Sequence, residues 1–204
     1  MNMKNITNEV KQVFASYNYL EQQPDVRGFR FCPQCGSGMT LCEVDGKKRA
    51  TCSRCGFIHY QNPAPCVSLL IVEAEKVLLV KRGGGNYLAD KWCLPCGFME
   101  YDEDFLSAAI REAEEETGLS VRIESILSVV SNFHTPGLHS LVVVLLARVV
   151  GGLLSPGDDV VACEWVPLSG PYPELAFVAD QHILERFSQT CLQGVPVDPD
   201  YAGC

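Results

Sequence analysis

This chain of 204 residues has little that would place it in a membrane or a repetitive assembly. Its longest apolar run, LVVVLLA from Leu141 to Ala147, is too short to cross a bilayer and is typical of a buried strand. The N-terminal stretch MNMKNITNEVKQVF has no apolar core of signal-peptide length. No internal repeat or low-complexity run is present. We therefore expect a cytoplasmic protein with no membrane partner.

Positive charge is also scarce, because 16 lysines and arginines face 25 aspartates and glutamates, which gives a net charge of −9. This balance argues against a nucleic-acid partner held by bulk electrostatics. Small anionic substrates stay open, since a bound divalent cation reverses the local sign of the charge. Hydrophobic residues make up 47% of the chain, a globular composition that can form one ordinary domain and a small appendage.

Changes in composition divide the chain into four segments. The first is polar, with a weak helical tendency over residues 9–19, and we assign it no function. The second is rich in turn residues, and the last is a tail that we expect to be disordered from Gly194. The segments are an N-terminal extension (1–28), a cysteine-bearing segment (29–62), the main domain (63–190) and the tail (191–204).

The main domain combines apolar runs of strand length with two helical patterns. The expected strands cover residues 66–72, 76–82, 121–130, 140–150 and 163–168, and the expected helices cover residues 104–117 and 177–187. Because these elements follow no regular βαβ repeat, the sequence predicts an α+β fold with a mixed sheet.

The first predicted helix contains REAEEE, in which like charges three or four residues apart repel by about 0.2–0.5 kcal/mol per pair. At about 100° per residue, Glu112, Glu115 and Glu116 share one edge of the helix, whereas Glu114 points to solvent. Three carboxylates on one edge suit a hard cation such as Mg²⁺, whose binding would relieve the repulsion. The alternative is a solvated acidic face, the usual explanation of a charge run.

The spacing around this helix favours the cation site. Gly97, five residues, Glu103, seven residues and then the run from Arg111 to Leu119 (REAEEETGL) match the Nudix box at every defined position. The chain from about residue 66 to residue 187 therefore resembles the Nudix hydrolases. This resemblance implies an α/β/α sandwich in which the box forms a loop, a helix and a second loop.

The resemblance also implies roles for individual residues. Glu112, Glu115 and Glu116 would hold Mg²⁺ or Mn²⁺, helped by the backbone carbonyl of Cys96, and the metal would activate a water for attack on a diphosphate. Glu103 and Arg111 would brace the loop as an ion pair and so take part in the catalytic set with Glu112 and Glu115. The general base varies within the family, and the candidates are Glu115, Asp158, Asp159 and Glu164.

Eleven cysteines, an odd number, do not read as a disulfide scaffold, because four of them fall in a metal-ligand pattern. Cys32 and Cys35 form one CxxC pair and Cys52 and Cys55 form another, each followed by glycine. Four thiolates at this spacing fit a structural zinc ion with no open coordination position. A pair of disulfides is the alternative, which a cytosolic setting disfavours. Cys42 lies between the pairs and is not an expected ligand.

A zinc ribbon placed directly before a Nudix domain resembles the NADH pyrophosphatase group and the ribbon-bearing FAD and ADP-ribose pyrophosphatases. The junction CGFIHYQNP, from Cys55 to Pro63, is similar to both. NADH pyrophosphatases carry SQPWPFP after the box, whereas this chain has SNFHTPG from Ser131 to Gly137. Homodimers are common among such enzymes, which leaves a homodimer open here.

Several weaker patterns admit two explanations each. Cys93 and Cys96 could be a redox pair, although plain packing is the simpler explanation in this context. Phe133, His134, His139, Tyr87 and Trp92 could contact a substrate or could be ordinary loop and packing residues. Lys47-Lys48-Arg49 is a solvated hairpin in the simpler explanation and too short a run to define an RNA patch.

Together these features predict a metal-dependent hydrolase. It would cut the pyrophosphate bond in nucleoside diphosphates linked to another group, of ADP-ribose, FAD or NADH type, and release a nucleoside monophosphate. Its cofactors would be catalytic Mg²⁺ or Mn²⁺ and structural Zn²⁺. The alternatives are an RNA-directed Nudix enzyme and a non-catalytic nucleotide sensor.

Overall fold

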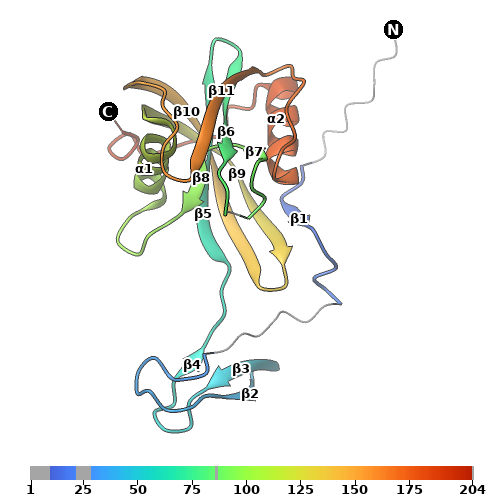
Figure 1. Ribbon diagram of the computed structural model, residues 1–204, viewed down its shortest axis with the longest axis vertical. Helices are drawn as coiled ribbons and strands as arrows, with labels where there is room; N and C mark the ends of the chain where they lie inside the picture. Colours follow the sequence, from blue (N-terminus) through green and yellow to red (C-terminus); the bar gives the residue numbers. More distant parts are fainter. Residues whose placement is uncertain (1–9, 22–28, 86, 204) are drawn as a thin grey trace. The chain divides into compact units, whose positions relative to one another are not determined.

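The computed structural model describes residues 10–21, 29–85 and 87–203. It divides into two compact units, one formed by residues 1–14, 65–132 and 141–204 and the other by residues 15–64 and 133–140. The elements in chain order (Figure 1) are β1 (Val13–Ala15), β2 (Thr40–Val44), β3 (Lys47–Thr51), β4 (Ile58–His59), β5 (Ala64–Glu73), β6 (Lys76–Arg82), β7 (Trp92–Cys93), β8 (Cys96–Phe98), α1 (Phe105–Thr117), β9 (Leu119–Thr135), β10 (Leu138–Gly152), β11 (Val160–Pro167), α2 (Val178–Thr190) and β12 (Val195–Pro196).

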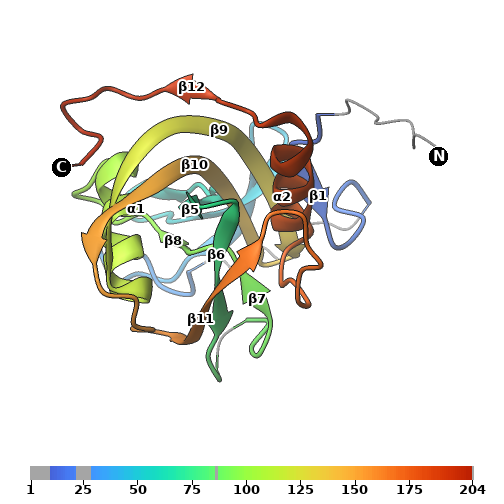
Figure 2. The ribbon, with the colours of Figure 1, turned by 90° about the horizontal axis from the view of Figure 1, so that it is seen from above.

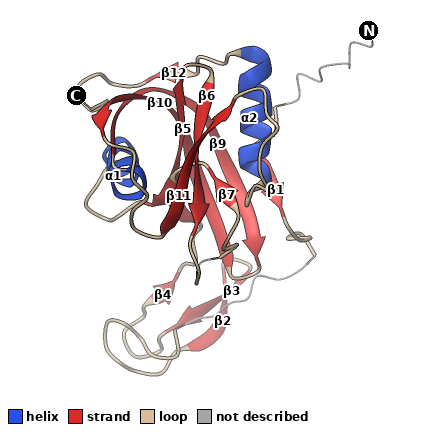
Figure 3. Ribbon diagram, turned by 45° about the horizontal axis from the view of Figure 1, so that its top comes forward, coloured by secondary structure: helices blue, strands red, loops and turns tan. Residues whose placement is uncertain are grey.

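The first unit is built on a nine-stranded sheet in the order β1-β9-β10-β5-β6-β11, to which β12, β7 and β8 pair at β9, β6 and β5. Helices α1 and α2 lie on opposite sides of this sheet (Figures 2 and 3). One hydrophobic cluster packs under α2 and includes Ile183 and Leu184. The other packs under α1 and includes Leu106 and Ala109. The predicted α+β sandwich is therefore confirmed.

Coverage of the sheet on both faces explains why the central strands read as continuous apolar runs. In β5 the residues from Cys66 to Ile71 are buried in succession, and in β6 those from Val77 to Val80 are buried. The two strands pair antiparallel through Val72 and Val77. Both strands were expected from the sequence.

Helix α1 begins and ends where the sequence predicts. The side chain of Asp104 caps the first turn by accepting hydrogen bonds from the amides of Leu106 and Ser107. Gly118 ends the helix with a left-handed backbone (φ 68°), a conformation that costs glycine nothing. The apolar face of α1, which includes Leu106, Ala109 and Ala113, packs against the sheet. This packing fixes the position of the adjacent acidic edge relative to the strands.

Two terminal predictions were wrong. Residues near 9–19 were expected to be weakly helical, but Val13–Ala15 form a strand beside β9, where the amide of Ser131 donates to the carbonyl of Gln12 (2.8 Å). The tail was expected to be disordered from Gly194, but β12 pairs with Ile126 and Ser125. In both cases the free edge of β9 supplies backbone partners that local sequence does not reveal.

The second unit contains an antiparallel three-stranded sheet in the order β2-β3-β4. Asp45 and Gly46, both with positive φ, form the tight turn between β2 and β3. None of the described helices is long and apolar enough to cross a membrane.

Candidate active site

The acidic edge of α1 has the arrangement that helical periodicity predicts. Glu112 and Glu116 are buried, Glu115 is about half exposed, and Glu114 faces solvent. Burial raises the pKa of Glu112, although the neighbouring Arg111 opposes this shift, and it raises the pKa of Glu116 well above its usual range. Two carboxyl groups have therefore been taken out of water on the same edge, which is costly unless something binds them.

The loop before the helix supplies one such partner. The amide of Cys96 donates to Oε2 of Glu116 across 3.0 Å. The next residue is Gly97, and a Cβ placed there would lie 2.1–2.3 Å from the carboxylate atoms of Glu112. Any larger residue would push the Glu112 carboxylate out of this position, so the packing of a glutamate of the box favours the first glycine of the same box.

Arg111 supplies the second partner. Its Nη1 donates to Oε1 of Glu112 and to Oε2 of Glu115, both across 2.8 Å. Its Nε and Nη2 grip Glu103 across 3.0 and 2.5 Å, and Nη2 also donates to the carbonyl of Phe98 (3.1 Å). The guanidinium thus joins three carboxylates and the loop. The hydrogen bonds of Arg111 lower the pKa of Glu103, and those of Glu103 raise the pKa of Arg111.

This network changes the explanation of the glutamate run. Metal binding was expected to relieve the repulsion, but Arg111 already neutralises part of it through Glu112 and Glu115. Among the described residues, only the cysteines of the second unit bring three or more metal-ligand atoms within 4.8 Å of one another. Carboxylate oxygens of this kind still fit a hard divalent cation, which would compete with the guanidinium for Glu112 and Glu115.

The loop after β10 closes the C-terminal end of α1. The amides of Ser155 and Gly157 donate to the carbonyls of Thr117 (2.9 Å) and Glu116 (3.1 Å), which the helix itself leaves without partners. Asp158 and Asp159 follow directly, and their charges contribute to the raised pKa values of Glu112 and Glu116 respectively. Both aspartates therefore lie within electrostatic reach of the acidic edge.

Glu164, another candidate base, is turned away from this edge. The thiol of its neighbour Cys163 donates to the carbonyl of Glu116 (3.6 Å). Because side chains alternate along β11, Glu164 projects from the opposite face of the strand and is exposed. The geometry therefore favours Glu115, Asp158 and Asp159 over Glu164.

Cys93 and Cys96 are free thiols in this structure. Cys93 is fully buried in a small cluster with Val80 and Val160, and Nη1 of Arg82 lies 4.0 Å from its sulfur. This environment fits a packing role for Cys93. Cys96 is placed at the site by its amide, and its carbonyl as a metal ligand stays a prediction.

Sequence reasoning missed one buried acid, Asp180. It lies in the first turn of α2, is only 5% exposed, and accepts a hydrogen bond from the amide of Leu94 (3.1 Å). Burial raises the pKa of Asp180 to about 7, while the Leu94 amide and Arg82 oppose that shift. The available signal was an acid in line with Ile183 and Leu184 on the apolar face of a helix.

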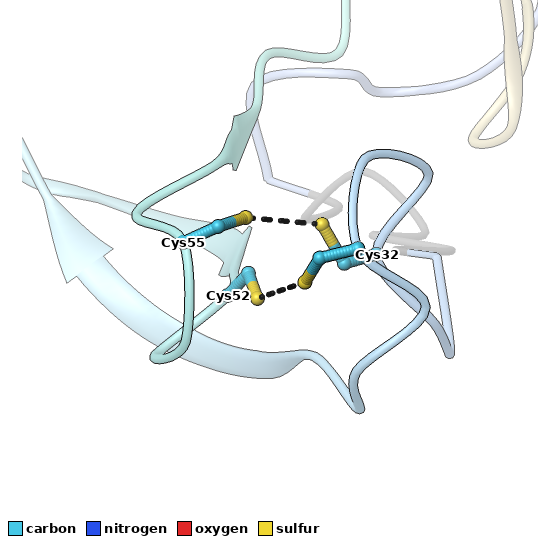
Figure 4. A group of neighbouring side chains, drawn as sticks. Cys32, Cys52 and Cys55 are labelled. Carbon is cyan, nitrogen blue, oxygen red and sulfur yellow. Dashed lines mark hydrogen bonds between the residues drawn. The ribbon is translucent and has the colours of Figure 1, made fainter.

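In the second unit, the four predicted cysteines meet (Figure 4). The Cys32 and Cys55 sulfurs lie 3.5 Å apart, as do those of Cys35 and Cys52. All four lie within 4.8 Å of one another. Four thiolates at about 2.3 Å from one zinc would be separated by roughly 3.8 Å, so this cluster fits a tetrahedral zinc site. Cys42 is exposed and outside the cluster.

The same unit contains a cleft of about 670 Å³. Lys47, Lys48 and Arg49 line it together with His59 and His139. The structure thus gathers the short basic run around a concave surface, which its sequence alone did not indicate.

The residues near the β9–β10 turn that were candidates for substrate contact interact with other residues of the second unit. Phe133 stacks on Tyr19 with the ring centroids 3.8 Å apart, and His139 lies edge-on to Phe133 at 4.4 Å. The ring of His139 also forms a hydrogen bond with the hydroxyl of Tyr17. His134 forms a hydrogen bond with Ser140 (3.0 Å). These contacts give the aromatic residues a structural role.

Comparison with known proteins agrees with this geometry. The NUDIX domain profile matches residues 62–187, and the zinc-ribbon profile of the Nudix N-terminal region matches residues 30–61. The chain therefore belongs to the Nudix hydrolase family. Members of this family are hydrolases, and the residues of the Nudix box lie on α1 and in the loop before it.

Individual relatives are more diverse. An ADP-ribose pyrophosphatase of Methanocaldococcus jannaschii is 38% identical over 119 residues, which cover 58% of this chain and 69% of the relative. An NAD-capped RNA hydrolase NudC of Pectobacterium carotovorum is 28% identical over 126 residues, and the match spans 62% of this chain but only 46% of that protein. The predicted absence of a nucleic-acid partner is therefore not confirmed.

Solved structures support the fold. A NUDIX hydrolase from Nitrosomonas europaea superposes with a TM-score of 0.69 at 29% identity, covering 83% of this chain and 96% of the other. A UDP-X diphosphatase superposes with a TM-score of 0.55 at 25% identity, covering 69% of each chain.

The cysteine cluster generates the first prediction. Protein purified without chelator should contain about one zinc per chain by elemental analysis, and Cys52→Ser should lose most of it. Because metal binding is coupled to folding of such sites, Cys52→Ser should also lower the melting temperature or solubility. Cys42→Ser is the matched control and should retain zinc. Zinc-free wild-type protein would contradict the assignment.

Proposed function

We propose that this chain hydrolyses the pyrophosphate bond of compounds in which an AMP half is joined to a second group. The observation that carries the proposal is the acidic edge of α1, where two buried glutamates and one half-exposed glutamate are braced by Arg111 and by the loop from Cys96 to Glu103. Burying two carboxyl groups on one helix edge costs free energy of desolvation, which a bound cation would offset.

Glu112, Glu115 and Glu116 would hold Mg²⁺ or Mn²⁺, with the carbonyl of Cys96 as a further ligand. When bound, the ion neutralises diphosphate oxygens and lowers the pKa of a bound water. Arg111 would keep its bidentate grip on Glu103 and release Glu112 and Glu115. Glu103 would thereby hold the arginine, and with it the loop, while the ligands turn toward the ion.

The proton of the attacking water needs an acceptor within hydrogen-bond reach. Glu115 is the most solvent-accessible of the three carboxylates. Asp158 and Asp159 lie within electrostatic reach of Glu112 and Glu116 on the same edge. We favour one of these three groups as the base and exclude none of them.

The substrate preference rests on sequence. The segment from Ser131 to Gly137 departs from the SQPWPFP of NADH pyrophosphatases, which argues for ADP-ribose or FAD ahead of NADH. The name of the archaeal relative, an ADP-ribose pyrophosphatase, points in the same direction. The products would be AMP and a second phosphate.

One observation favours a second candidate, an RNA-directed enzyme. The cleft lined by Lys47, Lys48 and Arg49 offers positive charge in a chain whose net charge is −9. Its bacterial relative is named an NAD-capped RNA hydrolase. RNA binding that weakens steeply with added salt would favour this candidate.

Removal of one metal ligand should lower activity without destabilising the fold. We expect Glu116→Gln to lower kcat by about 100-fold or more, because changes to groups that only support metal ligands already cost about 10–100-fold. Glutamine can still accept the hydrogen bond from Cys96, so the melting temperature should change little. The exposed Glu114→Gln is the control. A near wild-type rate for Glu116→Gln at saturating Mg²⁺ would refute the ligand assignment.

The substrate class is tested by kcat/KM for ADP-ribose, FAD, NADH, a nucleoside triphosphate and an NAD-capped oligoribonucleotide, with Mg²⁺ and then Mn²⁺. We expect ADP-ribose or FAD to lead NADH by about 10–200-fold if apolar contacts make the difference. AMP should appear among the products. A preference for NADH would overturn the ranking, and a preference for the triphosphate would overturn the substrate class. A preference for the capped RNA would support the second candidate.

A further inference from the structure

The segment from Trp92 to Gly97 carries the two backbone features on which the acidic edge depends, the Cys96 amide and the open space at Gly97. Its backbone is fixed at nearly every step. The amide of Trp92 donates to the carbonyl of Glu174 (3.0 Å), and the carbonyl of Trp92 accepts from Ala176 (2.7 Å). The carbonyl of Pro95 accepts from the amide of Leu69 (2.8 Å).

Two of these steps use buried carboxyl groups. The amide of Leu94 donates to Asp180 and the amide of Cys96 donates to Glu116. Asp180 belongs to α2 and Glu116 to α1, and these helices cover opposite faces of the sheet. Amides two residues apart in one loop are therefore held by acids from both outer layers of the sandwich.

The burial of Asp180, which brings its carboxylate to the Leu94 amide, costs free energy of desolvation. Asp180 stands in the first turn of α2, where a negative charge interacts favourably with the helix dipole. The N-cap residue of this helix, Phe177, supplies no side-chain cap. The carboxylate of Asp180 accepts a hydrogen bond from the amide of Leu94. Leu94 is fully buried, so its amide is not exposed to water. A buried acid retained in this position needs a purpose beyond the stability of its own helix.

We propose that Asp180 is a positioning residue for the catalytic centre, which fixes the Leu94–Cys96 turn so that the Cys96 amide meets Glu116 and Gly97 meets Glu112. It acts through the loop and touches neither metal nor substrate. The assignment rests on the proposed function for its catalytic consequence, but its effect on the loop and on metal affinity is measurable without turnover.

The test compares three substitutions in α2. Asp180→Ala removes the acceptor, whereas Asp180→Asn keeps an oxygen in the same place. Leu184→Ala, one turn further along and fully buried in the same hydrophobic cluster as Leu94, removes packing but leaves the Leu94 amide its acceptor. It should destabilise the protein by loss of burial alone.

The first readout is hydrogen exchange of the metal-free protein together with the Kd for Mn²⁺. We expect Asp180→Ala to lose hydrogen-exchange protection at the Leu94 and Cys96 amides selectively. We also expect its Kd for Mn²⁺ to rise about 10–100-fold, the usual effect of removing a group that supports metal ligands. Asp180→Asn keeps the acceptor oxygen and should change the Mn²⁺ Kd much less than Asp180→Ala does. Leu184→Ala should lower the melting temperature and leave the Mn²⁺ Kd unchanged.

Kinetics give the second readout. In Asp180→Ala, kcat should fall by a factor similar to the change in Mn²⁺ affinity, with a smaller change in KM, and Asp180→Asn should recover most of it. If Asp180→Ala does not fold, Asp180→Ser replaces it, because its shorter hydroxyl cannot reach Leu94.

The proposal is overturned if the alanine or serine variant is destabilised like Leu184→Ala but binds Mn²⁺ as wild type does. It is also overturned if Asp180→Asn is as impaired as Asp180→Ala. Absence of hydrolysis by the wild-type protein would instead refute the proposed function, while the exchange and Mn²⁺ measurements would still decide the role of Asp180.

Discussion

The structure depends on one guanidinium that holds three carboxylates. Arg111 grips Glu103 with two nitrogens and gives its third to Glu112 and Glu115, so the loop before α1 and the acidic edge of α1 are fixed to each other. Without this cation, like charges on neighbouring turns would repel in a partly dry environment. The arginine therefore makes an acidic helix edge compatible with burial. It also holds the carboxylate oxygens of Glu112 and Glu115 close together, where a divalent ion could replace the guanidinium.

The sandwich supplies the rigidity that such an arrangement needs. Continuous burial of β5 and β6 fixes the sheet, and α1 is seated on it through Leu106, Ala109 and neighbouring apolar residues. The segment from Trp92 to Gly97, which contains β7 and the start of β8, is paired to this sheet and meets both helices, through Asp180 on one side and Glu116 on the other. Positions of backbone amides within a few tenths of an ångström matter at a metal site, and strands and helices set such positions better than free loops.

Local sequence was sufficient wherever the deciding interactions are local. The helical pattern over residues 104–117 defined α1, which spans Phe105–Thr117, to within a residue. The sharing of one edge by Glu112, Glu115 and Glu116 followed from helical periodicity. Contacts between distant segments could not be read in this way. The β1 and β12 strands depend on a free edge of β9, the Leu94 amide depends on an acid 86 residues away, and the share of Arg111 in neutralising the glutamates depends on its rotamer.

We propose that the acidic edge braced by Arg111 binds the catalytic cation. A crystal structure of the protein soaked with Mn²⁺, with anomalous scattering recorded at the manganese edge, tests it most directly. We expect an anomalous peak from manganese bound by Glu112, Glu115 and Glu116, with Nη1 of Arg111 displaced from Glu112 and Glu115 and its bidentate contact with Glu103 retained. Manganese bound elsewhere, with all the Arg111 contacts intact, would contradict it.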